Sequence, residues 1–407
     1  MFRCVTTLRG LVIDIDTFEE PLEQWKFFLE NYFCCFLTFK EETNRLLEEK
    51  CAGAIIIFEP QYTYVFAPGP AIHEKVLKGL RLATSEIAYV SKNINFIENA
   101  LCFLSGTIWI KSDIFTYQNA SNCPDLVFDS LTDLSNRLKN QMTTGCFGEV
   151  MISPDTSVKR GYCQPVIFEV NNLMVVLFFL GRYYGYNHYM NQLHPYSTAI
   201  FWNKKKTSKA YGVFNVQFAD FFTKLVKHIK NNIGVDCICH VPVRPGHDNR
   251  FREIAEIVAK DNQVENISDS FVCIQDYETQ KGLTEAERRE NIRGVFEFHG
   301  RLQGKKIVLL DDIITTGATV EECIYVLRKA GAADVSVVVL AINQIGRTYW
   351  SSNQPSVICP KCGNRMHLLV NSNNQSFFYL CYDCKNIIGY EAGRTQLIEK
   401  VNQEFKS

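Results

Sequence analysis

The chain has 407 residues, which is too many for one ordinary domain and enough for two or three. Its 43 lysines and arginines nearly balance its 44 aspartates and glutamates, so no global basic field would attract the molecule to nucleic acid or to a membrane surface. The longest apolar run, residues 173–180, is far shorter than the ~20 residues that span a bilayer, and the start of the chain lacks a signal-peptide pattern. We therefore expect a soluble, cytoplasmic protein.

Residues 1–145 are expected to form a first domain of α/β or α+β type, whose function the sequence leaves unassigned. Residues 11–15 and 54–58 are short apolar runs typical of strands, and residues 20–36 have the periodicity of an amphipathic helix. A polar stretch at residues 130–149 then indicates the first domain boundary.

The first predicted strand ends in two acids, Asp14 and Asp16, within the segment VIDIDTF. This segment resembles the nucleophile strand of haloacid dehalogenase-like phosphohydrolases, in which a Thr or Val follows the second acid by two positions. Here Thr17 follows Asp16 directly. We interpret the acids as polar residues at a strand end, and keep phosphohydrolase activity as the weakest of three functional hypotheses.

A second domain is expected over residues 146–350. Residues 166–168 and 173–180 predict two antiparallel strands that cover a site. The segment from Tyr183 to Lys206 then interleaves aromatic residues with lysines, which could stack on bases and neutralise phosphates, or equally form core and rim. Apolar residues between Phe214 and Ile233 recur with helical spacing and predict a core helix.

A predicted buried strand at residues 236–240 leads into the loop VPVRPGHDNRF. Arg244 brings fixed positive charge, Pro245 stiffens the turn and Gly246 permits close approach of the backbone to a ligand. A helix predicted from Phe251 to Lys260 adds its N-terminal dipole in the same direction. The loop therefore suits a pyrophosphate group, whose developing charge needs cationic and N–H donors.

The segment KIVLLDDIITTGAT, Lys306 to Thr319, joins a buried strand, two acids and a turn of small residues before a predicted helix. Backbone N–H groups, hydroxyls and a helix N-terminus in the turn bind a phosphate dianion; they belong to Thr315, Thr316, Gly317, Ala318 and Thr319. Asp311 and Asp312 supply acceptors for sugar hydroxyls or reach a divalent metal through water. We predict a site for a phosphorylated sugar.

This segment resembles the 5-phosphoribosyl-1-pyrophosphate (PRPP) signature of type I phosphoribosyltransferases. That resemblance implies a parallel sheet flanked by helices with a small hood, and an oxocarbenium-like transition state. It also implies that Asp311 and Asp312 hold the ribose 2′- and 3′-hydroxyls while residues 315–319 hold the 5′-phosphate.

A charged stretch, residues 280–298, reads as a solvated helix or a mobile loop that could close over a polyphosphate. The ordered motifs VPV-R-x-G, Q-x-G-L-x-x-x-E-R-x-x-N-x-x-G-x-F and LLDDIITTGAT resemble the ComF-like competence-protein subgroup of these transferases, over roughly Tyr196 to Asn343. The family loop would include Gln280, Gly282, Leu283, Glu287, Arg288, Asn291 and Phe296. Of these, the resemblance favours Arg288 as the substrate contact.

Residues 351–407 are predicted to form a zinc ribbon followed by a helix. Cys359, Cys362, Cys381 and Cys384 form two C-x2-C turns, and each turn directs two thiolates at one ion. A closed set of four thiolates leaves no open position for chemistry, so the Zn²⁺ would be structural. ComF-like proteins usually carry their zinc-binding cysteines ahead of the transferase domain, whereas here they follow it.

The leading hypothesis is a Mg²⁺-dependent phosphoribosyltransferase that displaces pyrophosphate from C1 of PRPP. The alternative is a nucleotide-sensing regulator, or a competence or defence effector, built on the same scaffold. In that case the first domain or the ribbon would hold protein or nucleic-acid partners. The chain could also assemble into homo-oligomers. The acceptor base or amine is not readable from the sequence.

Overall fold

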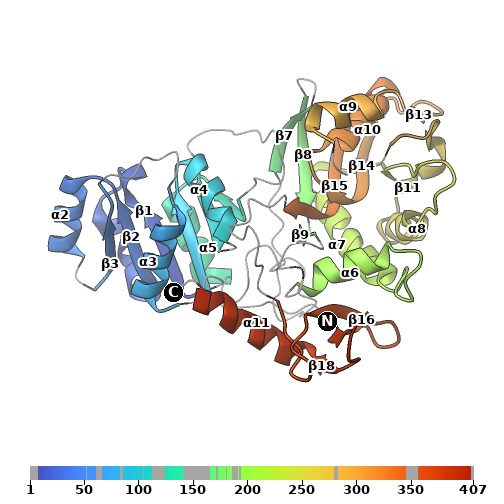
Figure 1. The fold of residues 1–407 in the computed structure, drawn as a ribbon. Coiled ribbons are helices and arrows are strands. Elements are labelled where there is room, and N and C mark those ends of the chain that lie inside the picture. Colours follow the sequence, from blue (N-terminus) through green and yellow to red (C-terminus); the bar gives the residue numbers. More distant parts are fainter. Residues whose placement is uncertain are drawn as a thin grey trace.

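The computed structural model describes residues 8–51, 53–60, 67–82, 86–103, 105–111, 124–141, 166–170, 173–179, 181–185, 191, 194–278, 283–344 and 356–404. Figure 1 shows two α/β units side by side and a smaller C-terminal unit beneath the second. No helix in these ranges is long and apolar enough to cross a bilayer.

The first unit is a six-stranded parallel sheet in the order β3-β2-β1-β4-β5-β6. Its strands are β1 Gly10–Asp14, β2 Phe33–Thr38, β3 Ile55–Phe58, β4 Ile87–Ser91, β5 Gly106–Ile110 and β6 Leu126–Phe128. Its helices are α1 Lys26–Asn31, α2 Glu41–Lys50, α3 Pro70–Leu80, α4 Ile94–Ala100 and α5 Leu131–Gln141. Because helices cover both faces, β1 and β4 are buried over their whole length.

The helix predicted over residues 20–36 is wrong at both ends: residues 22–25 form a 3-10 helix, and the α-helix begins only at Lys26. The α-helix ends at Asn31, and the run FCCFLT that follows is strand β2. The run is apolar at nearly every position because β2 lies inside the sheet with both faces covered, and such a run lacks the alternation that distinguishes a strand from a helix. The strands predicted at residues 11–15 and 54–58 are confirmed as β1 and β3.

The second unit is built on a sheet in the order β11-β10-β14-β15-β8-β7, with β9 also paired to β15. Its strands are β7 Val166–Val170, β8 Leu173–Phe179, β9 Arg182–Tyr184, β10 Cys237–His240, β11 Glu265–Asn266, β14 Lys306–Ile314 and β15 Asp334–Gln344. Among the strands described in this sheet, only β7 runs antiparallel to its neighbour, which confirms the predicted antiparallel pair. The pair forms one edge of the main sheet and is not a separate cover over a site. A separate two-stranded sheet joins β12 Phe271–Cys273 to β13 Phe296–Phe298.

Helices cover both faces of this second sheet. On one face lie α6 Pro195–Asn203, α7 Asn215–Ile233 and α8 Phe251–Asn262, packed on alternate residues of β14 such as Val308 and Leu310. On the other face lie α9 Glu285–Ile292 and α10 Ala318–Lys329, packed towards Ile307 and Leu309. The α/β fold with a central parallel sheet, expected from the sequence, is therefore present.

The C-terminal unit is a three-stranded antiparallel sheet of β16 Met366–Asn371, β17 Ser376–Cys381 and β18 Ile387–Gly389, followed by α11 Tyr390–Glu404. It packs against the second unit through stacked rings of Phe377 and Phe214, whose centroids lie 6.3 Å apart. Beside them the Gln375 side chain donates a hydrogen bond of 3.1 Å to the Val213 carbonyl.

The two α/β units are joined by a buried ion pair. Nε of Arg182 in β9 lies 2.6 Å from the carboxylate of Asp125, which directly precedes β6. Asp125 also accepts hydrogen bonds from the backbone and hydroxyl of Thr107 in β5. Both side chains of the pair are at most 5% exposed, so the contact excludes water.

Candidate functional site

Strand β14 places two consecutive acids on opposite faces of the second sheet. Successive side chains of a strand point to opposite faces, so the alternation seen in Leu309 and Leu310 continues into Asp311 and Asp312. Asp311 faces the side of α10 and lines a cavity of about 280 Å³. Asp312 faces α6 and α8 and lines a separate, much smaller cavity.

The larger cavity brings together most of the residues that the sequence predicts for the site. It is lined by Arg288, Asp311, Ile313, Ile314, Thr315, Thr316, Gly317, Ala318, Thr319, Val320 and Asn343. The turn between β14 and α10 wraps one side of it, and Gly317 takes a left-handed backbone conformation, with φ of 89°, directly before the helix. The cavity therefore combines backbone N–H groups, hydroxyls and a helix N-terminus, which together suit a phosphate.

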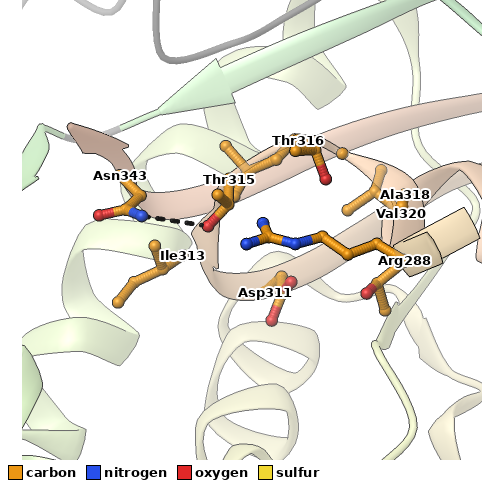
Figure 2. A pocket seen from close by; sticks show the side chains of 11 residues that line it. Arg288, Asp311, Ile313, Thr315, Thr316, Ala318, Val320 and Asn343 are labelled. Atoms are coloured by element: carbon orange, nitrogen blue, oxygen red, sulfur yellow. Dashed lines mark hydrogen bonds between the residues drawn. The ribbon is translucent and has the colours of Figure 1, made fainter. Parts of the chain in front are cut away.

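Arg288 reaches into this cavity from α9. Figure 2 shows its guanidinium extending over Asp311 towards Thr315. The helix that carries it begins with a capping box, in which the Thr284 and Glu287 side chains each accept a hydrogen bond from the other's backbone N–H. The Arg288 Nε–H donates to the Leu283 carbonyl at 3.0 Å, which orients the guanidinium.

Asn343 is a site residue that the sequence reasoning missed. It lies near the end of β15, and its side-chain amide donates a hydrogen bond of 3.3 Å to the Thr315 hydroxyl (Figure 2). The sequence does contain a signal for it. Asn343 is a polar residue at the end of an apolar run, in the strand that follows the LLDDIITTGAT motif. Its position needs the pairing of β15 with β14, which only the structure gives.

Asp312 is held by two cations instead of facing the cavity. It forms an ion pair with Arg250, immediately before α8, and its carboxylate lies 3.5 Å from Nζ of Lys204. Burial would raise the pKa of Asp312, but the charges of Arg250 and Lys204 outweigh it and lower the pKa to about 2. Burial, followed by the negative charge of Asp312, raises the pKa of Asp311 to about 7.

The loop after β10 borders the same edge of the sheet, because β10 and β14 are parallel neighbours. Arg244 in this loop donates to the Tyr277 carbonyl at 2.9 Å, and its guanidinium lies 5.4 Å from the centre of the Tyr277 ring. Pro245 and Gly246 are exposed, and Gly246 has a φ of +77° with open space where a Cβ would stand. None of these three residues lines the cavity around Asp311. Gln280 and Gly282 lie outside the described residues.

The acids of the first unit act as ties between strands. The Ser91 hydroxyl in β4 donates to Asp14 at 2.7 Å. Asp16 accepts from the Thr38 hydroxyl at 2.8 Å and from the backbone of Phe39 at 2.7 Å. These contacts support the interpretation of both acids as structural residues at a strand end.

The four predicted metal ligands form one cluster. The sulfur atoms of Cys359, Cys362, Cys381 and Cys384 all lie within 4.8 Å of one another, and two of the pairs are 3.4 Å apart. A tetrahedral ion with metal–sulfur bonds of about 2.3 Å would space its sulfurs by about 3.8 Å. The cluster therefore fits a zinc ion.

Comparison with known proteins places a family match on the same residues. Residues 249–362 match the phosphoribosyl transferase domain. The transcriptional regulator GfcR of Methanococcoides burtonii is 33% identical over 88 residues, which are 21% of this chain and 38% of that protein. The competence protein F of Haemophilus influenzae is 31% identical over 77 residues, 18% and 34% of the two chains. The DNA utilization protein YhgH of Escherichia coli K12 is 39% identical over 59 residues, 14% and 26%.

Residues 249–362 of this chain thus form a phosphoribosyl transferase domain, and this part of the chain is similar in sequence to stretches of competence and DNA utilization proteins. The aligned part spans about a quarter to two fifths of the length of these curated relatives. Among solved structures, the hypoxanthine phosphoribosyltransferase of Trypanosoma cruzi is 17% identical, with a TM-score of 0.26 over 35% of this chain and 74% of that one.

Proposed function

We propose that the cavity around Asp311 binds PRPP together with Mg²⁺, and that the protein displaces pyrophosphate from C1 of the ribose. The observation that carries this proposal is the joint placement of Asp311, the turn of residues 315–319 and the Arg288 guanidinium around one cavity. The turn would hold the 5′-phosphate, and Asp311 would accept from a ribose hydroxyl. A role for Asp312 would require its side chain to leave Arg250 and Lys204, which hold it on the opposite face of the sheet.

The reaction needs positioning and charge more than a nucleophilic side chain. The bond from C1 to the pyrophosphate oxygen breaks, the pyrophosphate leaves with the bonding electrons, and the acceptor forms the new bond at C1. Arg244 and Arg288 would stabilise the charge that develops on the leaving group. The carboxylate and hydroxyl oxygens around Asp311 are donors that Mg²⁺ prefers, and the ion would neutralise the pyrophosphate.

Titration calorimetry of the full chain with PRPP and Mg²⁺ tests this assignment. Arg288→Gln should weaken PRPP binding by roughly 10- to 150-fold, because a hydrogen bond to a charged group contributes about 1.5–3 kcal/mol. Arg289→Gln is the matched control, since Arg289 pairs with Glu321 at 3.0 Å and does not line the cavity. Equal affinities of the Arg288 and Arg289 variants for PRPP would contradict the proposal.

The second candidate function is a PRPP-binding regulator that does not turn its ligand over. It is favoured by the ion pairs that hold Asp312 on the face opposite the cavity, and by the similarity to GfcR, which is named as a transcriptional regulator. Pyrophosphate release, measured with PRPP and a panel of bases and amines, separates the two. Sustained release supports the transferase, whereas PRPP binding without release supports the regulator.

The cysteine cluster would hold a structural Zn²⁺ in the C-terminal unit. The three short strands of this unit enclose only a small core. A bound metal would supply the folding free energy that such a core lacks. We place no step of the reaction at this ion.

A further inference from the structure

A second cavity of about 280 Å³ lies between α6 and the C-terminal unit, and it shares no lining residue with the cavity of Asp311. One wall consists of Phe201 and Trp202 at the end of α6, with Lys205 in the following turn. The opposite wall consists of strand β16, of Arg365 directly before it, and of Tyr382 directly after β17. The lining residues are Asn191, Phe201, Trp202, Lys205, Arg365, His367, Leu368, Leu369 and Tyr382, and we call this cavity the ribbon groove.

Aromatic rings face the ribbon groove from both walls. The rings of Phe201 and Trp202 meet edge to face, with centroids 5.1 Å apart. On the other wall the rings of His367 and Tyr382 stack with centroids 4.5 Å apart. Tyr382 is 45% exposed although it is large and mostly apolar. Rings left partly open on two sides of a cavity provide faces on which a flat ligand can stack.

The charge in the ribbon groove is positive. Lys205 and Arg365 line it, and Nζ of Lys205 lies 4.9 Å from the centre of the Trp202 ring. Lys385 lies beside it, because its ammonium donates to the Tyr382 carbonyl at 2.7 Å. Among the described residues no acid lines the groove, although Asp383, next to Tyr382 in the chain, lies close enough to His367 to act on its pKa. Burial, aided by Arg365 and opposed by Asp383, lowers the pKa of His367, which favours the neutral ring as a stacking face.

We propose that the ribbon groove binds single-stranded nucleic acid, with one base stacked between the two aromatic walls and flanking phosphates on Lys205 and Arg365. A cavity of about 280 Å³ has room for one base between its two walls. Rings combined with cations at the rim are the arrangement that holds single strands without sequence preference. This proposal does not rest on the function proposed above.

Fluorescence anisotropy of the full chain with a labelled 12-nucleotide oligo-dT tests the proposal. Trp202→Ala and Tyr382→Ala should each weaken binding by about 5- to 150-fold, which is the range of 1–3 kcal/mol for one stacked base. Trp202→Phe should keep most of the affinity. Lys205→Gln should lower the slope of log affinity against log salt by about 0.7, the value for one phosphate contact of a single strand.

Phe33→Ala is the matched control, because Phe33 is an exposed aromatic residue, 55% exposed, with the Arg9 guanidinium 5.6 Å from its ring centre in the first unit. The control should bind the oligonucleotide like the parent chain, and an excess of PRPP should not displace the oligonucleotide. If Trp202→Ala does not fold, the oligonucleotide affinities of the Tyr382→Ala and Lys205→Gln variants still test the proposal, because both residues are exposed. Unchanged affinity of the Tyr382→Ala and Lys205→Gln variants would overturn the proposal. So would AMP that competes with the oligonucleotide at equal affinity, since the groove would then accept free nucleotides.

Discussion

Asp311 and Asp312 are neighbours in sequence but experience opposite environments. Asp311 is partly buried beside a like charge, and its pKa is raised to about 7. Asp312 is partly buried against Arg250 and Lys204, and its pKa is lowered to about 2. The alternation of strand β14 therefore separates one acid that resists ionisation from one that is always ionised near neutral pH.

This difference predicts opposite effects of the two isosteric substitutions on stability. The folded-state pKa of Asp311 lies above its ordinary value, so ionisation of Asp311 destabilises the fold as the pH rises from about 4 to about 7. Asp311→Asn avoids that cost, which is on the order of a few kcal/mol at 1.36 kcal/mol per pKa unit. We expect this variant to melt above the parent at pH 8, and to converge with it at pH 4.

Asp312→Asn should show the reverse. The pKa of Asp312 is lowered in the folded state, so its ion pairs stabilise the protein above pH 4 and are lost as the pH falls towards 2. The variant should melt below the parent at pH 8, because Arg250 and Lys204 lose their partner. Scanning calorimetry at pH 4, 6 and 8 measures both effects. Shifts of the same sign for both variants at pH 8 would contradict this account.

At the residue scale, the sequence motifs predicted most residues that line the cavity, but not the face of the sheet on which each side chain lies. Asp311, the turn of residues 315–319 and Arg288 do line one cavity. The two acids were expected to act together, whereas the strand sends them to opposite faces. Lys204 lies far along the chain from Asp312, so no local pattern could reveal their ion pair.

Among the elements, helix α9 depends most on its first turn. It has eight residues, few of them apolar, and its capping box satisfies N–H groups that would otherwise lack partners. Arg288 projects from this short helix into the cavity, so the geometry of the cap and the position of the guanidinium are linked.

Thr284→Ala should therefore weaken PRPP binding although Thr284 does not line the cavity. Loss of such a cap costs about 1 kcal/mol, which frays α9 and lets Arg288 sample other positions. We expect a decrease of roughly fivefold in PRPP affinity by titration calorimetry. Ser130→Ala removes a comparable cap in the first unit, where the Ser130 hydroxyl accepts from the backbone of Asp133, and should leave the affinity unchanged. Equal affinities of the two cap variants would be evidence against the coupling.

The C-terminal unit should lose its structure when its metal is removed. Thiolates within 4.8 Å of one another repel without an ion between them, and the core of the unit is small. We expect one zinc per chain by atomic absorption, and release of that zinc on Cys381→Ser. Cys273→Ser is the control, because Cys273 lies outside the cluster and should retain the metal. Zinc content that is unchanged by Cys381→Ser would refute the assignment.

At the element scale, spacing and motif predicted most helices and strands of the second unit. In the first unit the same reasoning failed at β2, because its apolar run lacks the alternation of apolar and polar residues that identifies a strand. The ribbon groove was beyond prediction for another reason. Its two walls lie about 160 residues or more apart in the chain, and the docking of the C-terminal unit on the second unit, through contacts such as Phe377 on Phe214, brings them together.

For the whole molecule, the buried pair of Arg182 and Asp125 couples the two α/β units. Asp125→Asn leaves the Arg182 charge buried opposite a neutral group, so we expect a loss of about 3–5 kcal/mol in stability. Denaturant unfolding measures the loss in each unit when it is followed by PRPP binding for the second unit and by tryptophan fluorescence for the first. The fluorescence needs a Trp202→Phe, Trp350→Phe background, in which Trp25 and Trp109 of the first unit are the remaining tryptophans. Lys111→Gln is the control, because its contact to Asp129 at 3.3 Å is largely exposed on the acid side. A loss confined to the first unit would argue against coupling.

The same pair constrains the order in which the chain reaches its folded form during synthesis. Asp125 leaves the ribosome 57 residues before its partner Arg182. Until then its carboxylate has Thr107 as a hydrogen-bond donor but lacks the guanidinium that compensates its burial. Domains generally fold from the N-terminus as they emerge. Here β6, the strand after Asp125, would gain its buried ion pair only after the first strands of the second unit have been synthesised.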